Sequence, residues 1–202
     1  MAVAEAHAHE HPPEAHHSSR VDARLLGIYF FIASEVMLFG SFFSAYFFAR
    51  VVAAGGQPWP PEGFELPVYL ALLNTIILVT SSFTMHWALQ SIKRNNRSGL
   101  VGGLTLTFLL GLTFLLIQAR EYTRIGFSPA DNAFGSTFFG LTGLHGAHVF
   151  IGLNLLLYAL IRSVRGHYGP EPEKHLGVEL PGIYWHFVDV MWIVVYTTVY
   201  VI

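Results

Sequence analysis

Long apolar segments divide the chain into five stretches that are each suited to crossing a membrane. They lie at about 25–49, 67–92, 100–122, 134–161 and 181–202. A helix rises 1.5 Å per residue, so roughly 20 apolar residues cross a hydrocarbon core about 30 Å thick. Glycine, proline and asparagine gather between the segments, as expected for connecting loops. The pattern predicts an all-α fold, with residues 24–202 forming a polytopic bundle of five transmembrane helices.

The stretch 134–152 differs most from a helix that faces lipid. It is apolar, yet it contains five glycines and the two histidines His145 and His148. Residues three apart lie on one face of a helix, and small residues let a neighbouring helix come close. Ionisable residues within a span face protein rather than lipid. We therefore expect this helix to lie against other helices, inside the bundle.

The composition agrees with membrane insertion and excludes several kinds of functional site. Of the 202 residues, 53% are hydrophobic and 12% are charged, whereas soluble domains carry about 25% charged residues. The absence of cysteine excludes disulfides, thiolate metal sites and cysteine nucleophiles. No basic patch indicates nucleic acid, and no charged-then-apolar pattern at the N-terminus indicates a cleaved signal peptide.

The first segment, 1–23, differs from everything that follows. It is polar and includes five histidines: His7, His9, His11, His16 and His17. Histidine-rich tracts can bind metal. The composition is also that of a disordered tail, and we assign no site to it.

The basic residues predict which way the chain crosses the membrane, because cytoplasmic loops are enriched in lysine and arginine. Eight basic residues fall on the side of the N-terminus: Arg20, Arg24, Lys93, Arg94, Arg97, Arg162, Arg165 and Lys174. Three fall on the other side: Arg50, Arg120 and Arg124. We therefore predict an N-terminus in the cytoplasm and a C-terminus outside.

Two carboxylates, Glu35 and Asp189, lie well inside predicted spans, away from their ends. An unpaired ion at such a depth costs at least about 2.5 kcal/mol, so each acid is either protonated or paired. Both could belong to a proton pathway, or each could join two helices as an uncharged hydrogen-bonding group. His86 and His148 fall at similar depth, which predicts a buried polar cluster on four helices without specifying which groups touch.

Histidines inside a membrane also raise the question of haem or metal ligation. His145, His148 and His186 are the candidate ligands. A haem usually needs two facing histidines, and a metal shell adds carboxylates or thiolates, so a pair one turn apart suits neither. We therefore predict no catalytic, cofactor or metal site in this chain. We assign structural polar roles to His86, His145, His148, His186, Gln118 and Glu121.

Several sequence blocks, in the same order along the chain, resemble subunit III of haem–copper terminal oxidases. They are 34–37 with Phe39, Phe43 and 46–47; 73–75 with 81–82; 118–122; 135–149; and 184–190. The acid-bearing helix of that family resembles the segment around Glu35. Longer members have seven helices, and this chain is similar to their last five, as in the short bacterial form.

The resemblance implies a non-catalytic subunit of a cytochrome c oxidase in a bacterial cell membrane. It implies that haem and copper belong to partner subunits, and that this chain docks on the catalytic subunit I beside subunit II. Oxygen reduction coupled to proton translocation would then be supported by this chain, which keeps the catalytic subunit stable and its proton uptake fast. Cytochrome c would be the electron donor of the complex, and membrane phospholipid a bound ligand.

Three alternatives differ from this interpretation. A quinol oxidase subunit would share the fold, although the acid in those proteins tends to be aspartate rather than glutamate. A membrane haem or metal carrier would use His145, His148 and His186. A proton-coupled transporter would use Glu35 and Asp189, but five helices without an internal repeat argue against it.

Overall fold

The computed structural model describes residues 22–202 and consists of helices and their connections. The helices are α1 (Ala23–Phe48), α2 (Val68–Lys93), α3 (Arg97–Tyr122), α4 (Ala133–Val164) and α5 (Pro172–Tyr196), with π-helical turns η2 (Ala49–Ala53) and η3 (Thr197–Val201). Five of the described helices are long and apolar enough to cross a membrane. The all-α fold with five spanning helices is therefore confirmed. The histidine-rich segment predicted to be disordered lies almost entirely outside the described residues.

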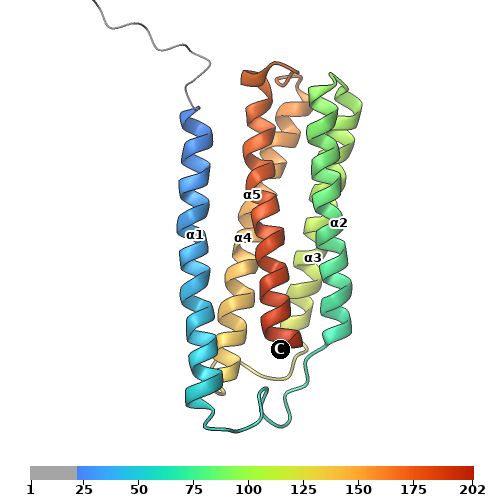
Figure 1. Ribbon diagram of the computed structural model, residues 1–202. Coiled ribbons are helices and arrows are strands. Elements are labelled where there is room, and N and C mark those ends of the chain that lie inside the picture. Colours follow the sequence, from blue (N-terminus) through green and yellow to red (C-terminus); the bar gives the residue numbers. More distant parts are fainter. Residues whose placement is uncertain (1–21) are drawn as a thin grey trace, which may run out of the picture.

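The helices run side by side and alternate in direction (Figure 1). The helix α1 stands at one edge, α2 and α3 at the other, and α4 and α5 lie between them. The α2–α3 pair forms the most extensive interface, while α1 contacts mainly α4 and to a lesser degree α5. The helix richest in glycine and histidine, α4, therefore lies inside the bundle, as its composition predicted.

Polar side chains define where three of the helices begin. Asp22, Asn96 and Asn132 each accept a hydrogen bond from a backbone N–H in the first turn, at 2.8, 3.0 and 2.8 Å. Such caps satisfy N–H groups that have no partner within the helix. Before α4, the Asp131 carboxylate accepts from the backbone N–H and the hydroxyl of Ser128, and these bonds hold its pKa below the usual value.

The fifth helix begins at Pro172 rather than near Pro181, the expected start of the last span. Proline is well suited to the first turn of a helix, because its missing N–H has no helical partner there. Pro181 lies in the helix interior and cannot bond the carbonyl four residues earlier. That carbonyl, of Gly177, instead accepts a hydrogen bond from the Tyr168 hydroxyl at 3.4 Å. A loop side chain thus replaces the bond that proline removes, and the helix continues.

Trp185 occupies the centre of the bundle and is completely buried. Its ring lies against Gly111 of α3 and Gly152 of α4, where an added Cβ would come closer than 3 Å to the ring carbons. Its Nε1 donates to the Ser81 hydroxyl of α2 at 2.8 Å. One side chain of α5 therefore contacts three other helices, and the two glycines provide the space for it.

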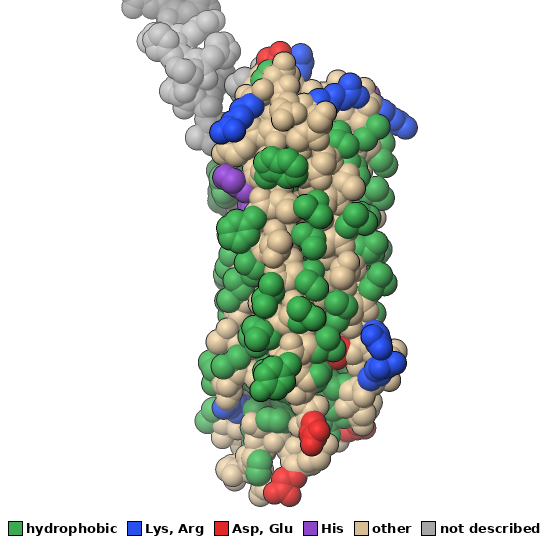
Figure 2. Space-filling model, turned by 90° about the vertical axis from the view of Figure 1, so that its right-hand side faces the viewer, with side chains coloured by type: hydrophobic (Ala, Val, Ile, Leu, Met, Phe, Trp, Pro, Cys, Tyr) green, Lys and Arg blue, Asp and Glu red, His purple; other side chains and the backbone are tan. Residues whose placement is uncertain are grey.

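Charged side chains mark the two ends of the bundle. Figure 2 shows apolar side chains along the whole length of one face, with most lysine and arginine at one end. The loops join α2 to α3 and α4 to α5 at this end, and α1 also begins here. The seven described basic residues counted on the N-terminal side therefore share one end of the molecule. Which end faces the cytoplasm stays a prediction.

Candidate functional site at the buried carboxylates

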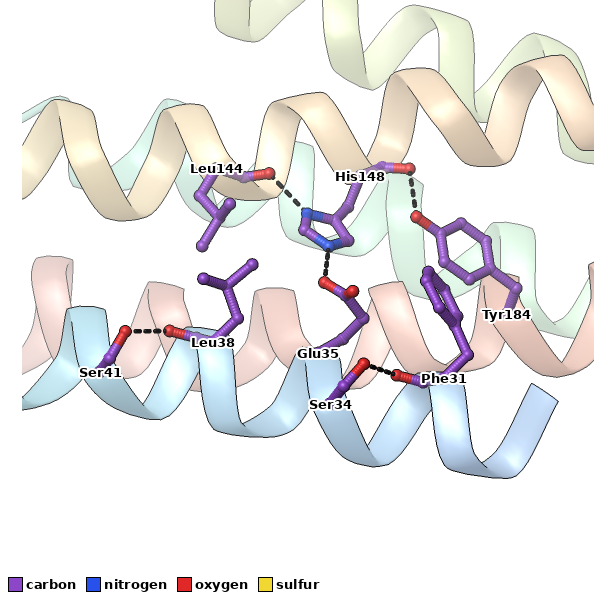
Figure 3. Close-up of polar contacts among 8 residues, drawn as sticks. All are labelled: Phe31, Ser34, Glu35, Leu38, Ser41, Leu144, His148 and Tyr184. Atoms are coloured by element: carbon purple, nitrogen blue, oxygen red, sulfur yellow. Dashed lines mark hydrogen bonds and ion pairs between the residues drawn. The ribbon is translucent and has the colours of Figure 1, made fainter. Parts of the chain in front are cut away.

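Glu35 of α1 and His148 of α4 meet between the two helices (Figure 3). Glu35 Oε2 lies 2.8 Å from His148 Nε2, and the side chains are 16% and 7% exposed. The two residues are 113 positions apart in the sequence. Of the two histidines predicted at similar depth, His86 and His148, the structure places His148 against Glu35. Ser34 and Ser41 instead donate to the carbonyls of Phe31 and Leu38 in their own helix.

A backbone carbonyl fixes the tautomer of His148. Its Nδ1 lies 2.8 Å from the carbonyl oxygen of Leu144, and this oxygen can only accept. The hydrogen of a neutral ring is therefore on Nδ1, which leaves Nε2 as an acceptor. Consequently Glu35 donates its own proton to Nε2, or that proton moves across and an ion pair forms. In both states the pair shares one proton in a single hydrogen bond.

Aromatic rings surround this hydrogen bond. The Phe39 ring lies 4.9 Å from the His148 ring between centroids, and the Tyr184 ring lies 6.5 Å from it. The Tyr184 hydroxyl donates to the His148 carbonyl at 3.3 Å. The histidine is thus fixed at its ring and at its backbone, in surroundings that favour uncharged groups.

Asp189 of α5 belongs to a second, separate network. Its Oδ2 accepts a short hydrogen bond from the Ser82 hydroxyl of α2, and Ser82 Oγ lies 2.9 Å from His186 Nδ1. The serine has one hydrogen and directs it to the acid, so His186 donates to Ser82. Asp189 Oδ1 is buried and has no hydrogen-bond partner within the described chain. This network joins α2 to α5, whereas the Glu35 pair joins α1 to α4.

The other two predicted histidines behave differently from each other. His145 is completely buried and donates from Nε2 to the Val188 carbonyl at 3.2 Å, with the Phe114 and Trp192 rings beside it. His86 is exposed on α2, and within residues 22–202 its one hydrogen-bond contact is Gln90, at 3.4 Å. The four groups expected in one cluster therefore separate into two networks, and His86 lies outside both.

Gln118 and Glu121 lie near the C-terminal end of α3, away from both networks. Glu121 is 3% exposed, and its Oε1 accepts from the Tyr200 hydroxyl at 3.2 Å. Its Oε2 and both polar atoms of Gln118 are buried without a partner among the described residues. Sequence reasoning placed these residues in a structural cluster but did not identify Tyr200, which comes from the last turn of the chain.

Comparison with known proteins decides the family. The family model described as cytochrome c oxidase subunit III matches residues 6–202. The cytochrome c oxidase subunit 3 of Thermostichus vulcanus is 41% identical over 202 residues, which is all of this chain and 94% of that protein. Those of Gallus gallus and Drosophila melanogaster are 42% and 44% identical, covering 93% and 86% of this chain and 73% and 67% of their own lengths. This chain belongs to the cytochrome c oxidase subunit III family.

Membership in this family favours the cytochrome c branch over the quinol oxidase alternative. The sequence blocks that carried the resemblance also coincide with the observed contacts. Glu35 and His148 come from two different blocks and form one hydrogen bond, and so do Ser82 and Asp189. In this chain, the carboxylates Glu35 and Asp189 of these blocks therefore each join two helices.

The described residues of this subunit III chain hold no group of three or more histidines, cysteines or acids placed to bind a metal ion. His145 and His148 are three positions apart, but they engage different helices, α5 and α1. Sequence reasoning missed the Leu144 carbonyl and the Ser82 hydroxyl, which complete the two networks. The one available signal was the four-residue spacing of Leu144 and His148, a distance at which a side chain can reach a backbone carbonyl of the same helix.

Proposed function

We propose that this chain is the non-catalytic subunit III of a proton-pumping cytochrome c oxidase in a bacterial plasma membrane. The observation that carries the proposal is the family match across residues 6–202 together with a relative of nearly equal length. Oxygen reduction then takes place on haem and copper in the catalytic subunit I, to which this chain docks beside subunit II. Electrons reach the complex from cytochrome c during aerobic electron transport.

The contribution of this chain is to keep the catalytic subunit stable during turnover and its proton uptake fast. Its two membrane carboxylates support this interpretation, because each is hydrogen-bonded across a helix interface rather than aligned along a pathway. Glu35 holds α1 to α4, and Asp189 holds α2 to α5. We therefore assign both acids to the assembly of a rigid surface against which another subunit can pack.

The test is the behaviour of the oxidase without this subunit. Deleting the gene for this chain should leave an enzyme that begins to reduce oxygen but inactivates after fewer turnovers. Its rate should also fall more steeply as the pH is raised above neutral. Re-adding the purified subunit should restore both properties. A subunit-depleted oxidase with the lifetime and pH profile of the intact enzyme would disprove the supporting role.

A further inference from the structure

A cavity of about 650 Å³ lies where α2 begins and α3 ends, at the end of the bundle opposite to most basic residues. One water molecule takes up roughly 30 Å³ of liquid, so this space is large enough for whole side chains. It is lined by residues of the α1–α2 loop, of both helices and of the segment after α3: Gly63, Glu65, Pro67, Leu70, Ile117, Arg120, Glu121, Arg124 and Ile125. The cavity beside Arg97, at the opposite end of α3, measures only about 20 Å³. The two ends of α3 therefore differ in how completely they are filled.

Three exposed charged side chains border this cavity: Arg120, Arg124 and Glu65. None of the three charged groups forms an ion pair or a hydrogen bond within the described part of the chain. Glu121 also lines the cavity, but its side chain is 3% exposed and its Oε1 accepts from Tyr200, so it offers no free surface to a partner. The accessible charges are therefore two positive and one negative, which leaves the cavity with an excess of one positive charge.

The helix itself explains only part of this arrangement. Arg120 and Arg124 lie at the C-terminal end of α3, where the helix dipole favours cations. However, like charges four positions apart repel each other. A carboxylate that accepts hydrogen bonds from both guanidinium groups removes this repulsion, and such charge-assisted bonds are the stronger ones in proteins. One carboxylate from outside the chain would thus complete the pair and also balance the excess charge.

The surface that continues from the cavity along α2 and α3 is apolar. Leu70 lines the cavity, and four apolar side chains further along the two helices are each more than half exposed: Leu73, Ile76, Leu109 and Leu116. Figure 2 views the bundle from the side of α2 and α3, and it shows apolar side chains over the whole length with charges of both signs at the lower end. A charged cavity thus borders one end of a long apolar face. This combination suits a transmembrane helix with an acid near one end.

We propose that another membrane subunit packs on this α2–α3 face, through a transmembrane helix with an aspartate or glutamate at the level of Arg120. The carboxylate accepts hydrogen bonds from Arg120 and Arg124, and apolar side chains of the same helix fill the cavity against Leu70 and Ile117. Arginine is enriched at protein interfaces and among the residues that contribute most to binding. This partner is present only if the chain is an oxidase subunit, so the inference rests on the function proposed above.

Photo-crosslinking in the intact complex identifies the occupant. Leu70→p-benzoylphenylalanine places a crosslinker in the cavity and keeps both arginines, and the membranes are irradiated before the oxidase is purified. We expect a crosslink to a transmembrane segment of another subunit, within one helical turn of an aspartate or glutamate. A crosslink to lipid alone, or to a segment without such an acid, would overturn the inference. If the unmodified chain does not co-purify with an oxidase, the proposed function fails, and the inference fails with it.

Charge reversal then tests the role of the arginines. The double variant Arg120→Glu and Arg124→Glu should reduce the amount of this chain that remains with the purified oxidase by about tenfold. The double variant Lys93→Glu and Arg94→Glu makes the same change of charge at the opposite end and is the control. Replacing the crosslinked acid of the partner by lysine should restore retention of the first variant. Equal losses in the two variants, or no restoration, would overturn the inference. The crosslink decides the question even if a charge variant fails to fold.

Discussion

At the scale of the residue, one backbone carbonyl decides where the proton lies in the hydrogen bond between Glu35 and His148. The Leu144 carbonyl holds a hydrogen on His148 Nδ1, so one proton remains for the bond between Nε2 and Glu35. Neutral partners avoid the cost of placing charge in an apolar site, and Ser34 and Ser41 are already bonded to carbonyls of their own helix. The geometry therefore favours Glu35 as the donor.

We predict that Glu35 is a protonated acid at pH 7. Infrared spectra of the purified chain should contain a protonated carboxyl band that disappears in Glu35→Gln. Asp189→Asn serves as the control, because it removes the carboxylate of the second network and should leave this band in place. If the Glu35→Gln difference spectrum contains only carboxylate bands, the proton lies on His148 and the pair is ionic.

Two glycines within spanning helices should respond differently to substitution by alanine. At Gly152 an added Cβ would lie 2.8 Å from Trp185 Cε3, whereas at Gly40 it would meet nothing within 4 Å. Overpacking a well-filled core typically costs about 1–3 kcal/mol. Gly152→Ala should therefore lower the thermal midpoint of the purified chain, and Gly40→Ala should leave it unchanged or raise it slightly. Equal midpoints for the two variants would contradict the assigned packing of Trp185.

At the scale of the element, helix existence was easier to predict than helix length. The apolar runs identify all five spans, because crossing a bilayer demands about 20 consecutive apolar residues. The start of α5 was predicted nine residues late, since 172–180 is polar and Pro181 resembles a helix start. The compensating contact from Tyr168 comes from tertiary structure, which periodicity along the chain does not contain.

The bond from Tyr168 to the Gly177 carbonyl should be coupled to Pro181. Tyr168→Phe leaves that carbonyl without a donor, which typically costs about 0.5–1.5 kcal/mol. In a Pro181→Ala background the restored N–H can bond the same carbonyl, so the cost of Tyr168→Phe should shrink. The two differences in unfolding free energy form a double-mutant cycle. Tyr69→Phe, at a 90% exposed position, is the control and should have no effect. Additive costs in the cycle would refute the coupling.

At the scale of the whole molecule, the sequence predicted the number of spans and a polar interior. It did not predict which polar side chains contact each other between the helices. Depth along each helix follows from counting residues, so Glu35, Asp189, His86 and His148 were placed at similar levels. Which side chains meet depends on how each helix is rotated about its axis. Small differences in rotation send His86 outward and bring His148 to Glu35, and no pattern within one helix determines that rotation.

We predict that the end of the bundle with most basic residues faces the cytoplasm. The chain has no cysteine, so single cysteines can report the side without background. Ser98→Cys, at the start of α3, should react with an impermeant maleimide only in inverted vesicles. Gln57→Cys, in the α1–α2 loop, should react only from outside intact cells. Labelling of position 98 from outside would reverse the predicted orientation.

The wide sequence separation of Glu35 and His148 has a consequence for the order in which the chain is made. The acid enters the membrane with α1, and its partner follows 113 residues later. At a synthesis rate of roughly 5–20 residues per second, this interval lasts about 6–23 s. During that time Glu35 is in lipid, or at the exit of the insertion machinery, without the histidine. Glu35 therefore enters the membrane uncharged. His148 is inserted later and meets an acid that is already protonated.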